Sequence, residues 1–181
     1  EPESNKSGFL RTAKAAAETG GSLFRLRAWN LSQEDYEALA SDLVKVLNGY
    51  GASLMLDRSA EMVKRVGAAG LHLSASALAE CEARPVPTAA WFAVSCHNRE
   101  ELLQAKKIGA DFAVLSPVAT TPSHPDKPAL GWSGFAQMRD DIAMPVFALG
   151  GLSAVDIETA WRNGAQGVVG IRAFWPPENS K

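Results

Sequence analysis

The chain has 181 residues, a formal net charge of −2 and 21% charged residues, as expected for an ordinary globular domain. It contains no basic stripe, long apolar run or signal-peptide pattern, which argues against partners such as nucleic acid or a membrane. Cys81 and Cys96 lack metal-ligand spacing and indicate free thiols in a reducing, cytoplasmic compartment. The polar segment at 1–8 is interpreted as a linker, followed by a domain at 9–176 and a tail at 177–181.

A glycine junction repeats along the chain and predicts the fold class. Gly20, Gly51, Gly67, Gly109 and Gly164 each follow a helical pattern and precede a short apolar run. Glycine commonly ends a helix because it adopts the left-handed conformation without a Cβ clash. A short apolar run bounded by turns is typical of a strand buried on both faces. The repeat therefore predicts alternating helices and strands with a parallel sheet.

In chain order, the sequence predicts a first helix at 9–19 and then seven strands. The strands are expected at 23–27, 54–56, 71–73, 91–94, 112–115, 146–149 and 168–171. Polar side chains followed by acidic residues mark helix starts at Ser32, Asn98 and Ser153. We expect an α/β fold of the (β/α)8 TIM-type barrel class that lacks or truncates its first strand. An open Rossmann-like sheet is the alternative, although no G-x-G-x-x-G motif follows a first strand.

Two arginines alternate along the first predicted strand. With a period of two, Arg25 and Arg27 lie on one face of it. A guanidinium inside a barrel needs an anionic partner because an unpaired buried charge is very costly. Asp57, at the end of the next strand, or a substrate phosphate could be that partner. A structural ion pair and a ligand site are both open.

Glycines and hydroxyl groups follow the later strands. Gly150-Gly151 and Gly170-Ile171-Arg172 end the last two strands, where glycines let a phosphate approach the backbone. The long polar loop at 116–128 suits a phosphate-gripping lid, and a plain surface loop is the alternative. His72 has apolar neighbours and is interpreted as a core histidine. The loop side chains with the chemistry to bind phosphate are Thr121, Ser123, His124 and Lys127.

Short segments spread from about residue 9 to 174 carry a family resemblance. They are Phe24-Arg25-Leu26-Arg27, Leu54-Met55-Leu56-Asp57, Gly70-Leu71-His72-Leu73, Ala93-Val94-Ser95-Cys96-His97, Ser116-Pro117-Val118 and Ala148-Leu149-Gly150-Gly151-Leu152. In this order they resemble thiamine-phosphate synthase and its thiazole-tautomerase relatives. Each segment is short, and together they are specific.

The resemblance implies a transferase of thiamine biosynthesis. Such an enzyme joins hydroxymethylpyrimidine diphosphate to thiazole phosphate and releases pyrophosphate, with Mg²⁺ as cofactor. By resemblance, Arg27, Ser95 and His124 are catalytic and Asp57 is a metal ligand. The implied phosphate-binding residues are Thr121, Ser123, Gly151, Ile171 and Arg172. Three further substrate- or phosphate-binding candidates come from their positions in the sequence: Gly150, Lys127 and Arg25, which stands where the family has glutamine.

The chain also departs from the family pattern. The stretch that supplies a second metal carboxylate in the family is Ser74-Ala75-Ser76-Ala77 here. A lysine of the family falls at Trp29, the lid lysine falls at His124, and the tautomerase histidine falls at Pro117. A single carboxylate makes a poor magnesium–diphosphate site, because that charge needs more than one anchor.

Three functions therefore follow as hypotheses. The first is a thiamine-phosphate synthase-like transferase with a degraded metal site. The second is a catalytically inactive phosphate-ligand-binding or regulatory barrel attached to a Nudix hydrolase domain. The third is another phosphate-handling barrel isomerase that uses His124 or His97 as acid–base. The expected partners are a small phosphorylated heterocycle and either a second copy in a homodimer or a covalently linked domain.

Overall fold

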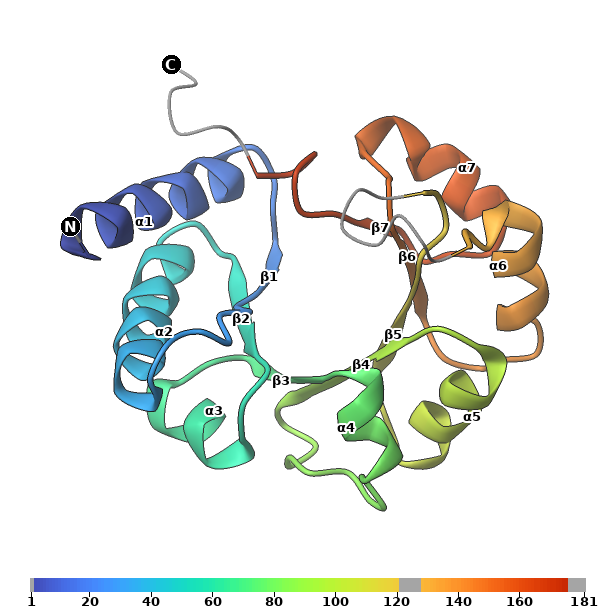
Figure 1. Ribbon diagram of the computed structural model, residues 1–181, viewed down its shortest axis with the longest axis horizontal. Coiled ribbons are helices and arrows are strands. Elements are labelled where there is room, and N and C mark those ends of the chain that lie inside the picture. Colours follow the sequence, from blue (N-terminus) through green and yellow to red (C-terminus); the bar gives the residue numbers. More distant parts are fainter. Residues whose placement is uncertain (1, 121–127, 176–181) are drawn as a thin grey trace. The chain divides into compact units, whose positions relative to one another are not determined.

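The computed structural model describes residues 2–120 and 128–175, in which helices and strands alternate (Figure 1). The helices are α1 (Pro2–Glu18), α2 (Gln33–Asn48), α3 (Ala60–Val66), α4 (Ala75–Ala79), α5 (Arg99–Lys107), α6 (Gly131–Arg139) and α7 (Ile157–Arg162), with a short 3-10 helix η1 (Ala154–Asp156) before α7. The strands are β1 (Leu23–Arg25), β2 (Ser53–Leu56), β3 (Gly70–Leu73), β4 (Trp91–Cys96), β5 (Phe112–Leu115), β6 (Val146–Leu149) and β7 (Val168–Val169). All seven predicted strands are present.

The chain forms two compact units. The first contains residues 1–72, 88–91 and 174–181, and the second contains 73–87 and 92–173. Within each unit the strands are parallel and are ordered in the sheet as they are in the chain. This is the helix-alternating parallel arrangement that the glycine repeat predicted.

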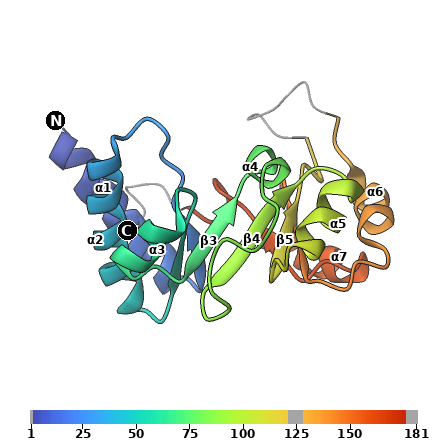
Figure 2. The ribbon, with the colours of Figure 1, turned by 90° about the horizontal axis from the view of Figure 1, so that it is seen from below.

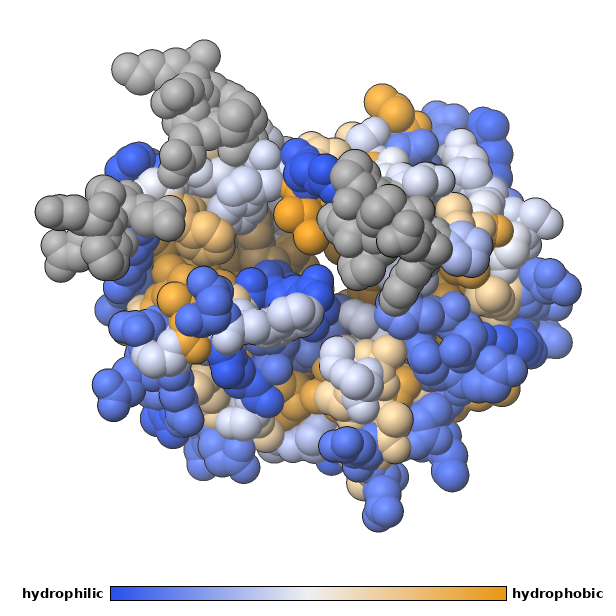
Figure 3. Space-filling model, viewed as in Figure 1, coloured by the Kyte–Doolittle hydropathy of each residue, from blue (hydrophilic) through white to orange (hydrophobic). Residues whose placement is uncertain are grey.

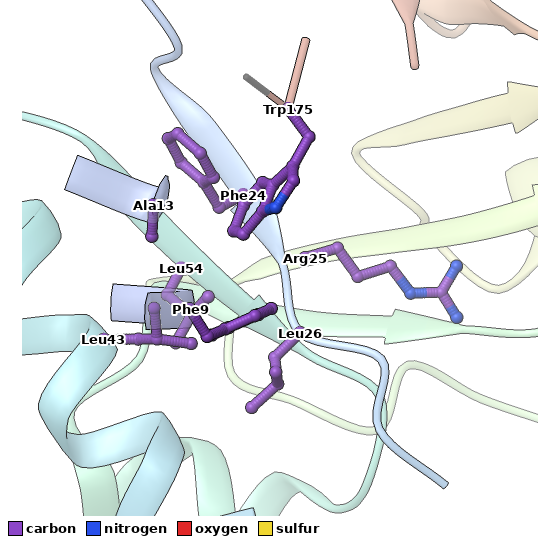
Figure 4. A pocket seen from close by; sticks show the side chains of 8 residues that line it. All are labelled: Phe9, Ala13, Phe24, Arg25, Leu26, Leu43, Leu54 and Trp175. Atoms are coloured by element: carbon purple, nitrogen blue, oxygen red, sulfur yellow. The ribbon is translucent and has the colours of Figure 1, made fainter. Parts of the chain in front are cut away.

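In the first unit, β1 separates an apolar cluster from a charged one. Phe24 and Leu26 face α1 and α2, and the Phe9 and Trp175 rings pack with their centroids 4.9 Å apart. Figure 4 shows Arg25 pointing away from this cluster, as the alternation of side chains along a strand requires. In the space-filling view, apolar residues are visible beside α1 and β1 (Figure 3).

In the second unit, the central strands are buried on both faces. All of β5 is buried, and so are Phe92, Ala93 and Val94 of β4. Figure 2 shows α5 beside β5, with which it packs, and α6 next to α5. The burial raises the pKa of the Cys96 thiol to about 12, and both cysteines are free.

The local signals in the sequence are found in the helix ends. Gly51, Gly67, Gly109 and Gly164 all have positive φ, as the repeated junction predicted. Ser32 accepts a hydrogen bond from the backbone N–H of Asp35, which is the N-cap expected there.

Some boundaries differ from the sequence analysis. The regular part of β1 ends at Arg25 rather than at residue 27, although the Leu26 N–H still donates to the Met55 carbonyl at 3.0 Å. α1 begins at Pro2 and so covers most of the segment interpreted as a linker. Near this start, Lys6 Nζ of α1 forms an ion pair with Asp42 Oδ2 of α2 at 2.7 Å. Among the described helices, none is long and apolar enough to cross a membrane.

Candidate functional site

Asp57 is the centre of a polar network at the C-terminal ends of β1 and β2, in the first unit. Its side chain is only 4% exposed. The Tyr36 hydroxyl lies 2.9 Å from Oδ1, and the Trp29 indole N–H donates to Oδ2 at 3.2 Å. Arg25 Nη2 and Asp57 Oδ2 form an ion pair with a separation of 3.9 Å, which is too long for a hydrogen bond. Both carboxylate oxygens are therefore occupied by neutral donors, with a guanidinium close by.

Tyr36 reaches this network from the first turn of α2. Its ring is completely buried, and the hydroxyl also lies 3.2 Å from the Leu26 carbonyl oxygen. The Asp57 backbone N–H donates to the same hydroxyl at 3.3 Å. Burial raises the pKa of Tyr36 well above its usual value, so the hydroxyl keeps its proton and can donate to Asp57.

The network is rich in guanidinium groups. Arg27 is exposed, and its guanidinium carbon lies 3.9 Å from the centroid of the Trp29 ring. Arg58 lies over the Tyr36 ring at 4.7 Å and donates to the Ala28 carbonyl at 3.0 Å. Arg25 is thus paired with the carboxylate, and Arg27 and Arg58 lie over the rings of its two donors, so these three arginines and Asp57 together carry a net positive charge.

Burial also lowers the pKa values of two neighbouring side chains, Arg25 on β1 and His72 on β3. It lowers the pKa of Arg25, and the Asp57 carboxylate opposes that shift. His72 is buried as predicted, and burial, followed by the Arg25 charge, lowers its pKa well below the usual range. His72 is therefore neutral at physiological pH, which supports its interpretation as a core histidine.

In the second unit, His97 joins the ends of β4 and β5. Its Nδ1 lies 2.9 Å from the Ser116 carbonyl oxygen, so this nitrogen carries the proton and donates. The backbone N–H of His97 donates to Glu101 Oε2 at 2.6 Å. Ser95, on β4, is half-buried and pairs in register with Val114. Both residues lie at the strand ends where the sequence analysis expected polar groups.

The Gly150-Gly151 pair packs against the start of the loop at 116–128, also in the second unit. A Cβ at Gly150 would lie 2.9 Å from Pro117 Cα, and one at Gly151 would lie 2.8 Å from the Thr120 carbonyl oxygen. Both glycines have positive φ. The Val118 N–H donates to the Leu149 carbonyl at 2.9 Å, which continues the strand pairing into the loop. The glycines thus permit a close approach between two backbone segments, and a phosphate site there remains a prediction.

The structure places the other candidates as follows. Ile171 and Arg172 are exposed after β7 in the second unit. Thr121, Ser123, His124 and Lys127 lie outside the described residues.

The residues at Asp57 do not fit a magnesium–diphosphate site. Magnesium binds oxygen ligands in near-octahedral geometry and is usually held by one or two carboxylates. Asp57 accepts one hydrogen bond at each oxygen, and a cation at its remaining lone pairs would lie beside the Arg25 guanidinium, whose Nη2 is 3.9 Å from Oδ2. Ser74, which begins the segment without a carboxylate, instead caps α4 by accepting from the Ala77 N–H at 3.2 Å. Within 2–120 and 128–175, no three His, Cys, Asp or Glu side chains are grouped to hold a metal ion.

Sequence reasoning missed the donors that hold Asp57. Neither Tyr36 nor Trp29 is singled out as a donor in the sequence analysis, which names Trp29 only as the position of a family lysine. The available signal was the spacing of Tyr36 after the Ser32 cap, which puts its side chain in the first helical turn beside the strand ends.

The comparisons with known proteins identify the family. The model of the thiamine monophosphate synthase family matches residues 1–174. A putative thiamine-phosphate synthase 2 of Aquifex aeolicus is 30% identical over 92% of this chain and 89% of its own length. A thiamine-phosphate synthase of Syntrophomonas wolfei is 30% identical over 92% of this chain and 80% of its own length.

Solved structures show the same fold. The thiamine phosphate pyrophosphorylase of Pyrococcus furiosus superposes with a TM-score of 0.75 at 20% identity, over 93% of this chain and 82% of that one. FabK (M276A) of Thermotoga maritima gives a TM-score of 0.71 at 13% identity, over 92% of this chain and 58% of that one. The expected TIM-like α/β class is thereby confirmed, and the chain belongs to the thiamine monophosphate synthase family.

Proposed function

We propose that the chain acts in thiamine biosynthesis by joining hydroxymethylpyrimidine diphosphate to thiazole phosphate. The single observation that carries this proposal is the family match over residues 1–174, together with relatives 30% identical over most of the chain. In this reaction the C–O bond between the pyrimidine methylene group and the diphosphate breaks. Its electron pair leaves with pyrophosphate, and the lone pair of the thiazole nitrogen forms the new C–N bond.

The arginines of the first unit suit the departing pyrophosphate. Negative charge develops on the diphosphate as the C–O bond breaks, and fixed cations there lower the barrier. Arg27 is exposed and stacked on Trp29, and Arg25 is ion-paired with Asp57. We assign diphosphate binding to these two arginines.

The remaining roles follow from the family resemblance and stay part of the proposal. Ser95 would contact the leaving group, and His124 with Lys127 would close over it. Thiazole phosphate binding would fall to Thr121, Ser123, Gly150, Gly151, Ile171 and Arg172. The ligand is thus a small phosphorylated heterocycle, and we expect the protein to act in the cytoplasm.

A second candidate function is supported by the state of Asp57. Because both oxygens of this carboxylate accept hydrogen bonds from Tyr36 and Trp29, the network resembles a structural anchor. A chain with this anchor could bind a phosphorylated ligand without turning it over, in a regulatory role. Attachment to a Nudix hydrolase domain and formation of a homodimer remain predictions.

A turnover assay separates the two functions. The purified chain is incubated with both substrates and excess MgCl₂, and thiamine phosphate and released pyrophosphate are quantified together. We expect equal amounts of the two products, strongly reduced in Arg27→Ala. The matched control is Arg162→Ala, which removes a surface arginine paired with Glu158 and should leave the rate unchanged. No product above the protein-free reaction would reject the synthase function and favour the binding role.

A further inference from the structure

We infer that the Arg25–Arg27 pair binds the diphosphate group directly, without a divalent cation, and that Trp29 positions this pair. The inference rests on the proposed function for its ligand and concerns how that ligand is held. It departs from the magnesium cofactor that the family resemblance implies.

The first step concerns Asp57, the carboxylate expected to hold a metal. It is 4% exposed, and its two oxygens accept hydrogen bonds from the Tyr36 hydroxyl at 2.9 Å and the Trp29 indole at 3.2 Å. Magnesium gives up its waters reluctantly and is held poorly by a single carboxylate, and an ion at Asp57 would also lie beside the Arg25 guanidinium, whose Nη2 is 3.9 Å from Oδ2. Asp57 therefore acts as an internal counter-ion for the arginines.

The second step concerns the charge that remains. Arg25, Arg27 and Arg58 contribute three positive charges to the cluster, and Asp57 contributes one negative charge. The surplus is the charge that a magnesium ion would otherwise bring to a diphosphate. Guanidinium groups bind phosphate oxygens through paired, charge-assisted hydrogen bonds, so they can replace a metal as the electrostatic partner.

The third step concerns Trp29, which contacts both Asp57 and Arg27. Its indole N–H holds Asp57 Oδ2, and the face of its ring supports the Arg27 guanidinium at 3.9 Å. A stacked guanidinium keeps its N–H edge available for an anion, because the stacking uses only the flat face. Trp29 thus orders Arg27 and also donates a hydrogen bond to the Asp57 carboxylate.

The test is calorimetric titration of the chain with inorganic pyrophosphate, in excess EDTA and in excess MgCl₂. We expect binding in EDTA that MgCl₂ does not tighten. Arg27→Ala should weaken it at least about tenfold in EDTA, as the loss of a charge-assisted contact implies. Arg162→Ala, the surface control, should bind as the unmodified chain does.

Trp29 is tested by two substitutions that separate its contacts. Trp29→Phe keeps a ring under Arg27 and removes the N–H, so pyrophosphate binding in EDTA should remain within a few-fold. Trp29→Ala also removes the ring and should weaken binding clearly more. Trp161→Phe is the matched control, since Trp161 is 60% exposed and its indole N–H donates to the Gln166 carbonyl.

The outcomes separate this inference from the proposed function. Pyrophosphate binding that requires MgCl₂, or that Arg27→Ala leaves intact, overturns the inference even if turnover is observed. An absence of binding under both conditions overturns it as well. Metal-free binding without turnover supports the inference and rejects the synthase function.

Discussion

Replacement of Tyr36 by phenylalanine tests the Asp57 network directly. The ring is completely buried and would stay packed, so the substitution opens no cavity. It removes the hydroxyl that lies 2.9 Å from Asp57 Oδ1 and accepts the Asp57 backbone N–H. A hydrogen bond to a buried charged group is worth about 1.5–3 kcal/mol, and we expect the free energy of unfolding to fall by that amount.

The assay is urea unfolding followed by circular dichroism, in EDTA so that no metal contributes. With a slope of about 1–3 kcal/mol per molar urea, the midpoint should fall by roughly 1 M. The control is Tyr50→Phe, which alters the only other tyrosine of the chain. Tyr50 is 42% exposed, so its loss should cost less than about 0.5 kcal/mol. Equal effects of the two substitutions would refute the view that Asp57 depends on a buried hydroxyl.

Two further predictions concern His72 and Gly150. Burial lowers the pKa of His72 in the folded state, so the unfolded chain binds a proton first as the pH falls. Stability should therefore decline below about pH 6.5, by up to ~1.4 kcal/mol per pH unit. His72→Gln should reduce this decline in unfolding midpoints measured at several pH values, whereas His97→Gln, at an exposed site, should retain it. Gly150→Ala should lower the melting temperature by several degrees, because φ is +113° and the new Cβ would lie 2.9 Å from Pro117 Cα. Gly134→Ala, in α6 with its Cβ 3.5 Å from the nearest side chain, should be neutral or stabilising, and equal losses would contradict the packing described at Gly150.

Most of the fold could be predicted because its signals are local. A glycine at Gly51, Gly67, Gly109 or Gly164 ends a helix through its own backbone conformation, and the apolar run after it is buried wherever the strand lies. The start of α1 was missed for the opposite reason. Its polar residues suggest a linker, and its Lys6–Asp42 ion pair depends on α2, which a later part of the chain forms.

The site was only partly predictable. Alternation along a strand placed Arg25 and Arg27 on one face and suggested Asp57 as a partner, and the ion pair is present. The donors to Asp57 could not be read from the sequence, because Tyr36 meets it only after α2 packs against β2, and Trp29 meets it from the segment between β1 and α2. A single aspartate at a strand end is compatible with a metal ligand or an internal counter-ion, and only its neighbours decide between them.

The metal dependence of turnover tests the central claim most directly. The chain is assayed with both substrates after exhaustive EDTA treatment and again after MgCl₂ is restored, with pyrophosphate release as the readout. We predict that the rate in EDTA stays close to the rate in MgCl₂, because Arg25 and Arg27 supply the charge. Turnover that disappears in EDTA and returns with MgCl₂ would contradict this account, and it would assign Asp57 to a metal.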